Sequence, residues 1–264
     1  MRFLINYALI GGTGVEHLEL DGKRAQTIQT PYGLVEVEVG SIANQEIAFV
    51  KRHGAGHAVP PHLVNYRGNI WAIKELGVKK ILATAAVGSL STEYRLGELV
   101  LLDQFLDFTK TRIQTFFEGG TQGVLHVDLT EPYCKDLQKT ILTAGKQNEI
   151  VVKTDATYVC TEGPRFETPA EIRMFQMLGG HLVGMTSVPE VVLAREQGMC
   201  YASIGMVTNE AAGIADHPLT HAEVMDSMKM LSTTVAQLIS DSLKLLTPVQ
   251  HCSCVKGNEE LGKF

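Results

Sequence analysis

Arg52 and His53 follow an apolar segment, 46–51, and precede a stretch rich in glycine and proline. Arginine offers a planar fork of charged N–H donors, and this geometry suits a dianion such as phosphate. His53 and His57 have the spacing of one helical turn, but the intervening glycines rule out a helix and with it a zinc-protease type of metal site. The pattern favours an anion site, with an exposed loop of mutually paired charges as the alternative.

Two other turns also favour an anion. The sequence GGTG at 11–14 forms a tight turn that offers backbone N–H groups and the Thr13 hydroxyl. It is not a complete dinucleotide-binding motif, because His17 stands where the third glycine would be. Thr186 precedes an expected helix, whose first N–H groups attract anions. Each turn alone is weak evidence, but the three turns together favour a phosphate subsite.

Three further groups of small or polar residues follow apolar segments. Ala85 and Ala86 lie in a small-residue turn that permits close backbone approach to a ligand, although it could equally be a packing turn. Glu167 precedes a capped helix and is either a pocket residue or a solvated loop acid. Asn209 ends the apolar run 200–207. In an open α/β sheet, ligands bind where such strand ends converge.

The elements that must position these residues alternate along the chain, which predicts an α/β fold with a single domain over 1–248 and a polar tail over 249–264. Expected strands lack polar alternation, which indicates burial on both faces; they are 6–10, 46–51, 80–84, 98–103, 151–160, 181–185 and 200–207. Expected helices are 64–76, 168–178, 188–197 and 220–246. Segment 104–131 has no clear period, and a loop of that length usually has a function.

Composition narrows the class of partner. The 264 residues carry a formal net charge of −6, and the sequence pI is about 5.9. These values argue against a nucleic-acid or anionic-membrane partner. Five cysteines without a disulfide framework suit a cytoplasmic protein. Cys252 and Cys254 could hold a metal or form a redox pair, but we favour a frayed polar terminus there.

The motifs together resemble a known family. The sequences GGTG, VNYRGNIWA, EGPRFET and GMTSVPEVVLARE are similar to those of the trimeric purine nucleoside phosphorylases, and most similar to the methylthioadenosine and methylthioinosine phosphorylase branch. The resemblance covers roughly residues 6–246. It implies one α/β domain with a mixed central sheet flanked by helices, a homotrimer with active sites near subunit interfaces, and no metal or organic cofactor. The implied reaction is reversible phosphorolysis, in which phosphate attacks the ribosyl C1′ and the purine leaves.

The resemblance also implies individual roles. Met185 would lie against the ribose, Asn209 and Glu167 would face the base, and His126 would reach into a neighbouring subunit's active site. His221 would meet the 5′ end of the nucleoside, or it is simply a solvated first-turn residue. The phosphate-binding residues would be Thr13, Arg52, His53 and Thr186, assisted by the backbone around Ala85 and Ala86.

Residue types at the base site predict the substrate. Members of the family that act on 6-aminopurines carry an aspartate at the position of Asn209 and another at that of Ala211. An amide both donates and accepts, so Asn209 can donate to O6 and still meet N7. Glu167 can accept from N1–H, which 6-oxopurines carry and adenine lacks. Inosine and guanosine are therefore the expected substrates, with S-methyl-5′-thioinosine as a further one. S-methyl-5′-thioadenosine phosphorylase is the alternative.

Other function classes make different predictions. A nicotinamide dehydrogenase would need the complete glycine motif and an acidic residue about 20 positions later. A non-catalytic nucleotide-binding module would release no base from any nucleoside. A nucleoside hydrolase would release the base without phosphate.

Overall fold

The computed structural model describes residues 5–12, 14–15, 18–215, 220–257 and 261–262. These residues form a nine-stranded mixed sheet whose strand order is β10-β6-β8-β9-β5-β1-β4-β3-β2. The strands are β1 (Tyr7–Gly11), β2 (Asp21–Thr30), β3 (Gly33–Ile42), β4 (Gln45–Lys51), β5 (Lys80–Ser89), β6 (Leu99–Phe108), β8 (Val152–Thr161), β9 (Leu182–Gly184) and β10 (Cys200–Glu210). The predicted α/β class with a mixed sheet is confirmed.

Part of this sheet closes into a ring. β10 pairs with β6 on one side and with β5 on the other, and β5 also pairs with β9. β6, β8 and β9 complete the circuit through parallel pairings. The ends of β5, β9 and β10 are therefore brought side by side, although their sequences are far apart.

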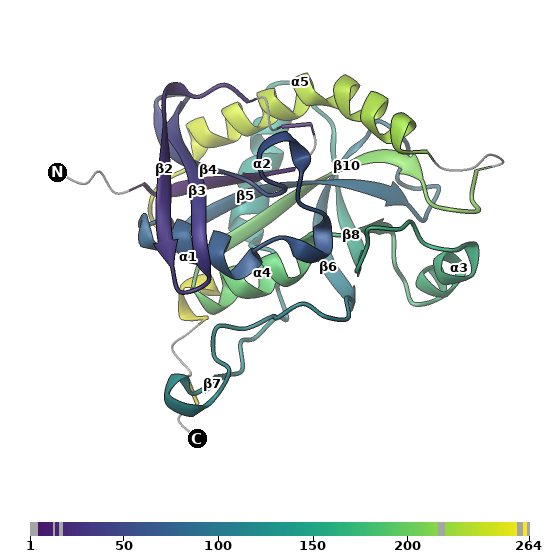
Figure 1. Ribbon diagram of the computed structural model, residues 1–264. Coiled ribbons are helices and arrows are strands. Elements are labelled where there is room, and N and C mark those ends of the chain that lie inside the picture. The colour runs from purple at the N-terminus through teal and green to yellow at the C-terminus, as the bar shows by residue number, and fades with distance from the viewer. Residues whose placement is uncertain (1–4, 13, 16–17, 216–219, 258–260, 263–264) are drawn as a thin grey trace.

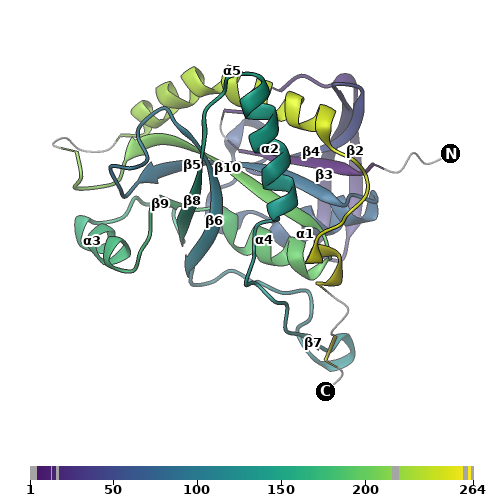
Figure 2. The ribbon, with the colours of Figure 1, turned by 180° about the vertical axis from the view of Figure 1, so that it is seen from behind.

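Helices cover both faces of the sheet (Figures 1 and 2). α1 (Tyr66–Glu75) and α4 (Ser187–Glu196) pack over one apolar cluster, and α2 (Lys135–Gln147) and α5 (His221–Leu245) pack over a second one. α3 (Pro169–Met177) contributes Ile172 and Phe175 to a smaller cluster near one end of the ring. No helix in the described ranges is both long and apolar enough to cross a bilayer.

The expected strands and helices are all present, but three of the longer elements, as well as the short strands Val124–Leu125 and Leu261–Gly262 and the 3-10 turns, were missed. β2 is mostly exposed and polar, so it lacks the apolar run that marked the other strands. β3 alternates apolar and polar residues, as a strand with one solvated face does. α2 lies in a region where no helix was expected.

The long segment 104–131 has three parts. Its first residues extend β6 to Phe108, and the next ones pack on the body through the buried Arg112 and Phe116. The part around β7 (Val124–Leu125) forms an arm that projects from the body (Figure 1). The expected frayed terminus is ordered where the structure describes it. The 3-10 turn Ser253–Lys256 packs on the body through the buried Cys254, and β11 (Leu261–Gly262) pairs with β7.

Candidate active site

A cavity lies where the ends of β4, β5, β9 and β10 meet, and its lining brings together most of the predicted site residues. Its walls include Arg52, His53, Ala85, Ala86, Glu167, Met185, Thr186, Asn209 and Ala211. Thr13 lies outside the described residues, and so does the side chain of His221, although the backbone of His221 begins α5. His126 is exposed beside β7 and does not line this cavity in its own chain.

Arg52 is held by an acidic partner that the sequence did not reveal. Its Nε and Nη2 donate to the two carboxylate oxygens of Glu190, each at 2.7 Å, and Nη1 donates to the Thr84 carbonyl at 2.8 Å. Both side chains are about 1% exposed. The Tyr201 hydroxyl also donates to Glu190 at 2.7 Å. The guanidinium is thus fixed in a buried bidentate pair, which leaves two of its five N–H donors for a ligand.

Nη1 of Arg52 faces the glycine turn. A side-chain Cβ at Gly12 would lie 3.1 Å from this nitrogen and 3.6 Å from Nε2 of His53. Gly12 therefore keeps the space in front of both nitrogens open. An anion seated against this turn could meet the remaining donors of Arg52.

His53 is oriented by the backbone. Its Nδ1 lies 2.8 Å from the Val59 carbonyl, so Nδ1 carries the proton and Nε2 is left on the side of Gly12. Burial, together with the charge of Arg52, lowers the pKa of His53 to about 4. A neutral His53 accepts a hydrogen bond from a protonated phosphate oxygen, whereas an imidazolium, favoured by a bound dianion, donates to one.

The lowered pKa of His53 predicts acid-sensitive stability. Unfolding restores an ordinary histidine, so between about pH 6.5 and pH 4 the unfolded chain binds a proton that the native chain does not. The free energy of unfolding therefore falls as the pH drops, by about 2 kcal/mol at pH 5 from this residue alone. Urea titrations of the wild type and of His53→Asn, which retains a donor near Val59, test this. An equal pH dependence of the two proteins contradicts the prediction.

Asn209 is turned toward the cavity by an irregularity in β10. The register between β10 and β5 shifts between Val207 and Asn209, so Asn209 lies opposite Gly88. A Cβ at Gly88 would stand 2.9 Å from Nδ2 of Asn209, so glycine is needed for this close approach. Oδ1 accepts from Thr208 at 2.8 Å, and Nδ2 donates to the Glu210 carbonyl at 2.8 Å. One Nδ2 hydrogen and one Oδ1 lone pair remain for a ligand.

Glu167 is a partly buried acid whose carboxylate accepts hydrogen bonds from its own chain. Its Oε1 accepts from the Thr161 hydroxyl at 2.6 Å. Burial raises the pKa of Glu167, and the Thr161 hydrogen bond works against that rise. The reading of Glu167 as a solvated loop acid is therefore wrong. The side chain is an acceptor held in the wall of the cavity.

Thr186 and Met185 occupy the turn between β9 and α4. The Thr186 amide donates to the Tyr158 hydroxyl at 3.1 Å, so its hydroxyl, rather than this amide, is the group that a phosphate can use. The sulfur of Met185 packs against Gly163, where a Cβ would come within 2.6 Å of it. Gly163 also has a positive φ of 66°, which favours glycine.

Arg112, from the segment 104–131, fixes this turn from behind and was not anticipated. Its side chain is 2% exposed. Nη1 donates to the carbonyls of Met185 at 2.6 Å and Val188 at 2.7 Å. Nη2 donates to the carbonyls of Thr161 at 3.1 Å and Glu162 at 2.7 Å. Arg112 therefore ties the end of β8 to the start of α4, and it is a positioning residue for Met185 and Thr186.

Comparisons with known proteins agree with this geometry. A family model described as the Phosphorylase superfamily matches residues 6–244. The chain is 48% identical to the 6-oxopurine nucleoside phosphorylase of Pyrococcus furiosus, over 94% of this chain and 95% of the relative. It is also 48% identical to a probable S-methyl-5′-thioinosine phosphorylase of Methanopyrus kandleri, over 95% and 96%. A solved methylthioadenosine phosphorylase of Schistosoma mansoni with adenine superimposes with a TM-score of 0.90 at 30% identity, covering 97% of each chain.

Proposed function

Because the chain belongs to the phosphorylase superfamily, we propose that it is a purine nucleoside phosphorylase specific for 6-oxopurines. It would convert inosine or guanosine and phosphate reversibly to the free base and ribose 1-phosphate, and S-methyl-5′-thioinosine to the methylthio sugar phosphate. The observation that carries this proposal is the pairing of Asn209 and Glu167 in one cavity with Arg52 and His53.

The cavity supplies what phosphorolysis requires. Phosphate held by Arg52, His53 and Thr186 is placed against the sugar, which removes the entropic cost of a bimolecular encounter. A phosphate oxygen then forms a bond to C1′ while the bond from C1′ to the purine nitrogen breaks. The bonding electrons go to the purine, where a donor from Asn209 stabilises the developing negative charge at the N7/O6 edge. No organic cofactor takes part in this step, and phosphate is the co-substrate.

Base selection follows from the polar groups of Asn209 and Glu167. The remaining Nδ2 hydrogen of Asn209 suits the O6 acceptor of hypoxanthine or guanine, and the Glu167 carboxylate, which only accepts when ionised, suits N1–H. Adenine offers an amino group and an unprotonated N1 in their place. The alternative, S-methyl-5′-thioadenosine phosphorylase, is favoured by the fold similarity to the Schistosoma mansoni enzyme. Asn209 argues against it.

A nucleoside panel tests the proposal directly. Inosine, guanosine, adenosine, S-methyl-5′-thioinosine and S-methyl-5′-thioadenosine are each incubated with and without phosphate, and the free base is measured. We expect phosphate-dependent release from the 6-oxopurine nucleosides, with adenosine slower by roughly a hundredfold or more. Preference for a 6-aminopurine nucleoside would assign the alternative activity. Release without phosphate would show a hydrolase, and no release at all would show a binding module.

The 5′ specificity is tested at His221. A histidine can hydrogen-bond a 5′-hydroxyl, whereas a methylthio group requires apolar surroundings. His221→Val is therefore expected to shift the ratio of kcat/KM values from inosine toward S-methyl-5′-thioinosine, by about tenfold for one lost hydrogen bond. The control is His251→Val, a histidine that does not line the cavity. An unchanged ratio in His221→Val removes His221 from the pocket.

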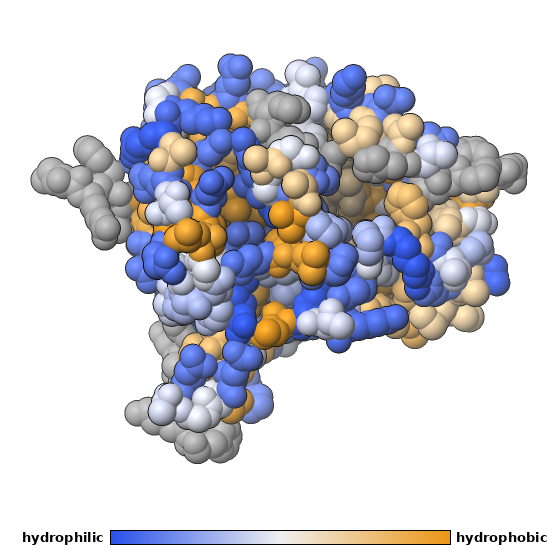
Figure 3. All heavy atoms as spheres, viewed as in Figure 1, coloured by the Kyte–Doolittle hydropathy of each residue, from blue (hydrophilic) through white to orange (hydrophobic). Residues whose placement is uncertain are grey.

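The proposal extends to assembly and cellular role. We propose a homotrimer in the cytoplasm that serves purine salvage, with His126 on the β7 arm completing a neighbour's site. Exposed apolar groups support self-association: Leu34 is 66% and Leu63 is 65% exposed, and Figure 3 shows apolar side chains gathered toward the middle of a largely hydrophilic face. Light scattering after gel filtration tests the trimer. His126→Ala should lower activity without changing the mass of the assembly.

A further inference from the structure

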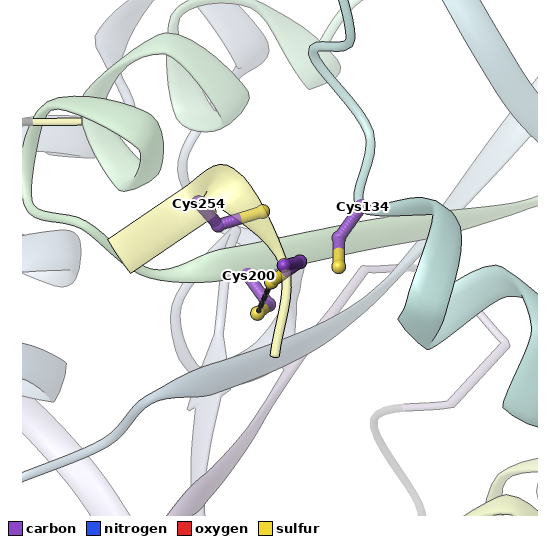
Figure 4. Close-up of side chains that lie close together, drawn as sticks. Cys134, Cys200 and Cys254 are labelled. Carbon is purple, nitrogen blue, oxygen red and sulfur yellow. Dashed lines mark hydrogen bonds between the residues drawn. The ribbon is translucent and has the colours of Figure 1, made fainter. Parts of the chain in front are cut away.

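Four of the five cysteines meet at one point, far from the cavity that binds the nucleoside. The sulfur atoms of Cys134, Cys200, Cys252 and Cys254 all lie within 4.8 Å of one another. Figure 4 shows Cys134, Cys200 and Cys254 gathered from separate elements. Three of these side chains are buried, and Cys252 is partly exposed. The sulfurs of Cys200 and Cys252 are 3.3 Å apart, and all four residues are free cysteines.

The four residues come from three separate segments. Cys134 is the N-cap of α2, Cys200 is the first residue of β10, and the other two flank the start of the turn Ser253–Lys256. Backbone bonds position the first two: the Cys134 amide donates to the Tyr201 carbonyl at 2.8 Å, and the Cys200 amide donates to the Lys79 carbonyl at 2.9 Å. The cluster is therefore built into the ends of regular elements and is not a chance contact of mobile side chains.

The positive end of a helix and an amide donor adjoin the sulfurs. Cys134 stands at the positive end of α2, which favours a thiolate there. Nε2 of Gln250 lies 3.3 Å from the Cys200 sulfur and can donate to it.

A buried guanidinium with unsatisfied donors lies beside the cluster. Arg195 is 4% exposed, and neither its Nε nor its Nη1 has a hydrogen-bond partner in the described part of the chain. Arg195 and the cysteine turn are adjacent, because a Cβ at Gly257 would overlap the Arg195 carbonyl oxygen and lie 3.3 Å from the Cys254 carbonyl oxygen. Buried N–H donors that lack hydrogen-bond partners are costly. An anionic group at the cluster would offset this cost.

We propose that these four cysteines form a structural site for one thiophilic divalent metal ion, zinc. Four thiolates around Zn²⁺ at about 2.3 Å form a tetrahedron whose sulfurs are about 3.8 Å apart, a spacing that the cluster nearly has already. Metal binding releases the four thiol protons to solvent. The resulting site carries a net charge of −2, which Arg195, the α2 N-terminus and the Gln250 amide offset. This inference replaces the expected frayed terminus and is independent of the proposed function.

The site would act on stability and not on catalysis. β10 runs from Cys200 at the cluster to Asn209 at the cavity, a distance of roughly 30 Å for nine residues of strand. The metal would join the segment after α5 to the start of α2 and to the first residue of β10. Because the unfolded chain holds no such preformed site, metal binding stabilises the native state.

Metal analysis of the full chain, produced without a histidine tag and purified anaerobically with a reductant, tests the proposal. We expect about one zinc per chain, released in step with modification of the four thiols by an organomercurial. The double variant Cys252→Ser/Cys254→Ser should lose the zinc and unfold at a lower temperature, while phosphorolysis at room temperature is retained. Cys160→Ser, a matched change of the fifth cysteine, should keep the metal.

Three results would overturn the proposal. One is a wild-type protein that holds no metal and shows its thiols free. Another is mass spectrometry that finds the four cysteines joined as disulfides in the reductant-protected protein, which would make the cluster a covalent crosslink. The third is a zinc content unchanged in the double variant. If that variant does not fold, the organomercurial titration of the wild type decides the matter, because zinc bound elsewhere would not leave as these thiols react.

Discussion

Asn209→Asp is expected to lower kcat/KM for inosine by roughly 10- to 100-fold and to raise the relative rate on adenosine. An ionised aspartate has no donor for O6 of hypoxanthine. The carboxylate oxygen and the O6 carbonyl oxygen, both acceptors, would therefore stand opposite each other without a hydrogen bond. With adenine, the same carboxylate can accept from the exocyclic amino group. Because the shifted register of β10 fixes where residue 209 points, the change should act on the base and not on the fold.

Steady-state kinetics on inosine and adenosine at saturating phosphate measure this effect. Asn209→Ala is the matched control, because it removes the amide without adding a charge and should impair both substrates. Ala211→Asp, combined with Asn209→Asp, should increase the preference for adenosine further. The assignment of Asn209 to the base site fails if Asn209→Asp leaves the ratio of the two substrates unchanged.

Arg52→Ala is expected to have the largest effect on stability, a loss of about 3–5 kcal/mol in the free energy of unfolding. The reason is that Glu190, 1% exposed, would remain as a buried carboxylate without its cation. The KM for phosphate should rise as well, because the charged donors beside Gly12 are lost. These two consequences must be separated, since a destabilised protein also loses activity.

The double variant Arg52→Met/Glu190→Gln separates them. It removes both buried charges, and the glutamine oxygen still accepts from the Tyr201 hydroxyl. We expect it to recover part of the lost stability in urea titrations and to keep the high KM for phosphate. A double variant with the wild-type KM for phosphate would mean that Arg52 only supports Glu190. The phosphate subsite would then have to be assigned to other residues.

The local sequence was sufficient to locate the strand ends that carry site residues. It was not sufficient to identify the long-range side-chain pairs that hold those residues in place. Arg52 and Asn209 stand out because each follows an apolar run, and the structure brings both to one cavity. Glu190 could have been noticed because it is an acidic residue among the apolar residues of a helix that stays apolar as far as Ala194. An acidic side chain buried in such a helix requires a buried cation. Its partner lies 138 residues away, and no spacing rule identifies it.

Arg112 and the cysteine cluster were missed for the same reason. Arg112 lies in an irregular segment and bonds four backbone carbonyls, which leave no mark in the side-chain sequence. Cys252 and Cys254 are close in sequence, but Cys134 and Cys200 join them only through the tertiary fold. In contrast, β2 was missed because its exposed, polar residues give no apolar pattern to recognise.

The closed ring of β5, β10, β6, β8 and β9 has a consequence for how specificity changes in evolution. Each strand of the ring is paired on both of its sides, so a strand cannot move without breaking hydrogen bonds to two neighbours. The backbone at the cavity therefore tolerates little adjustment. New substrates must then be accommodated by exchanging side chains at strand ends such as Asn209. Of two relatives that are each 48% identical to this chain, one is named for 6-oxopurine nucleosides in general and the other for S-methyl-5′-thioinosine. A single codon change could therefore redirect an enzyme of this kind long before its architecture diverges.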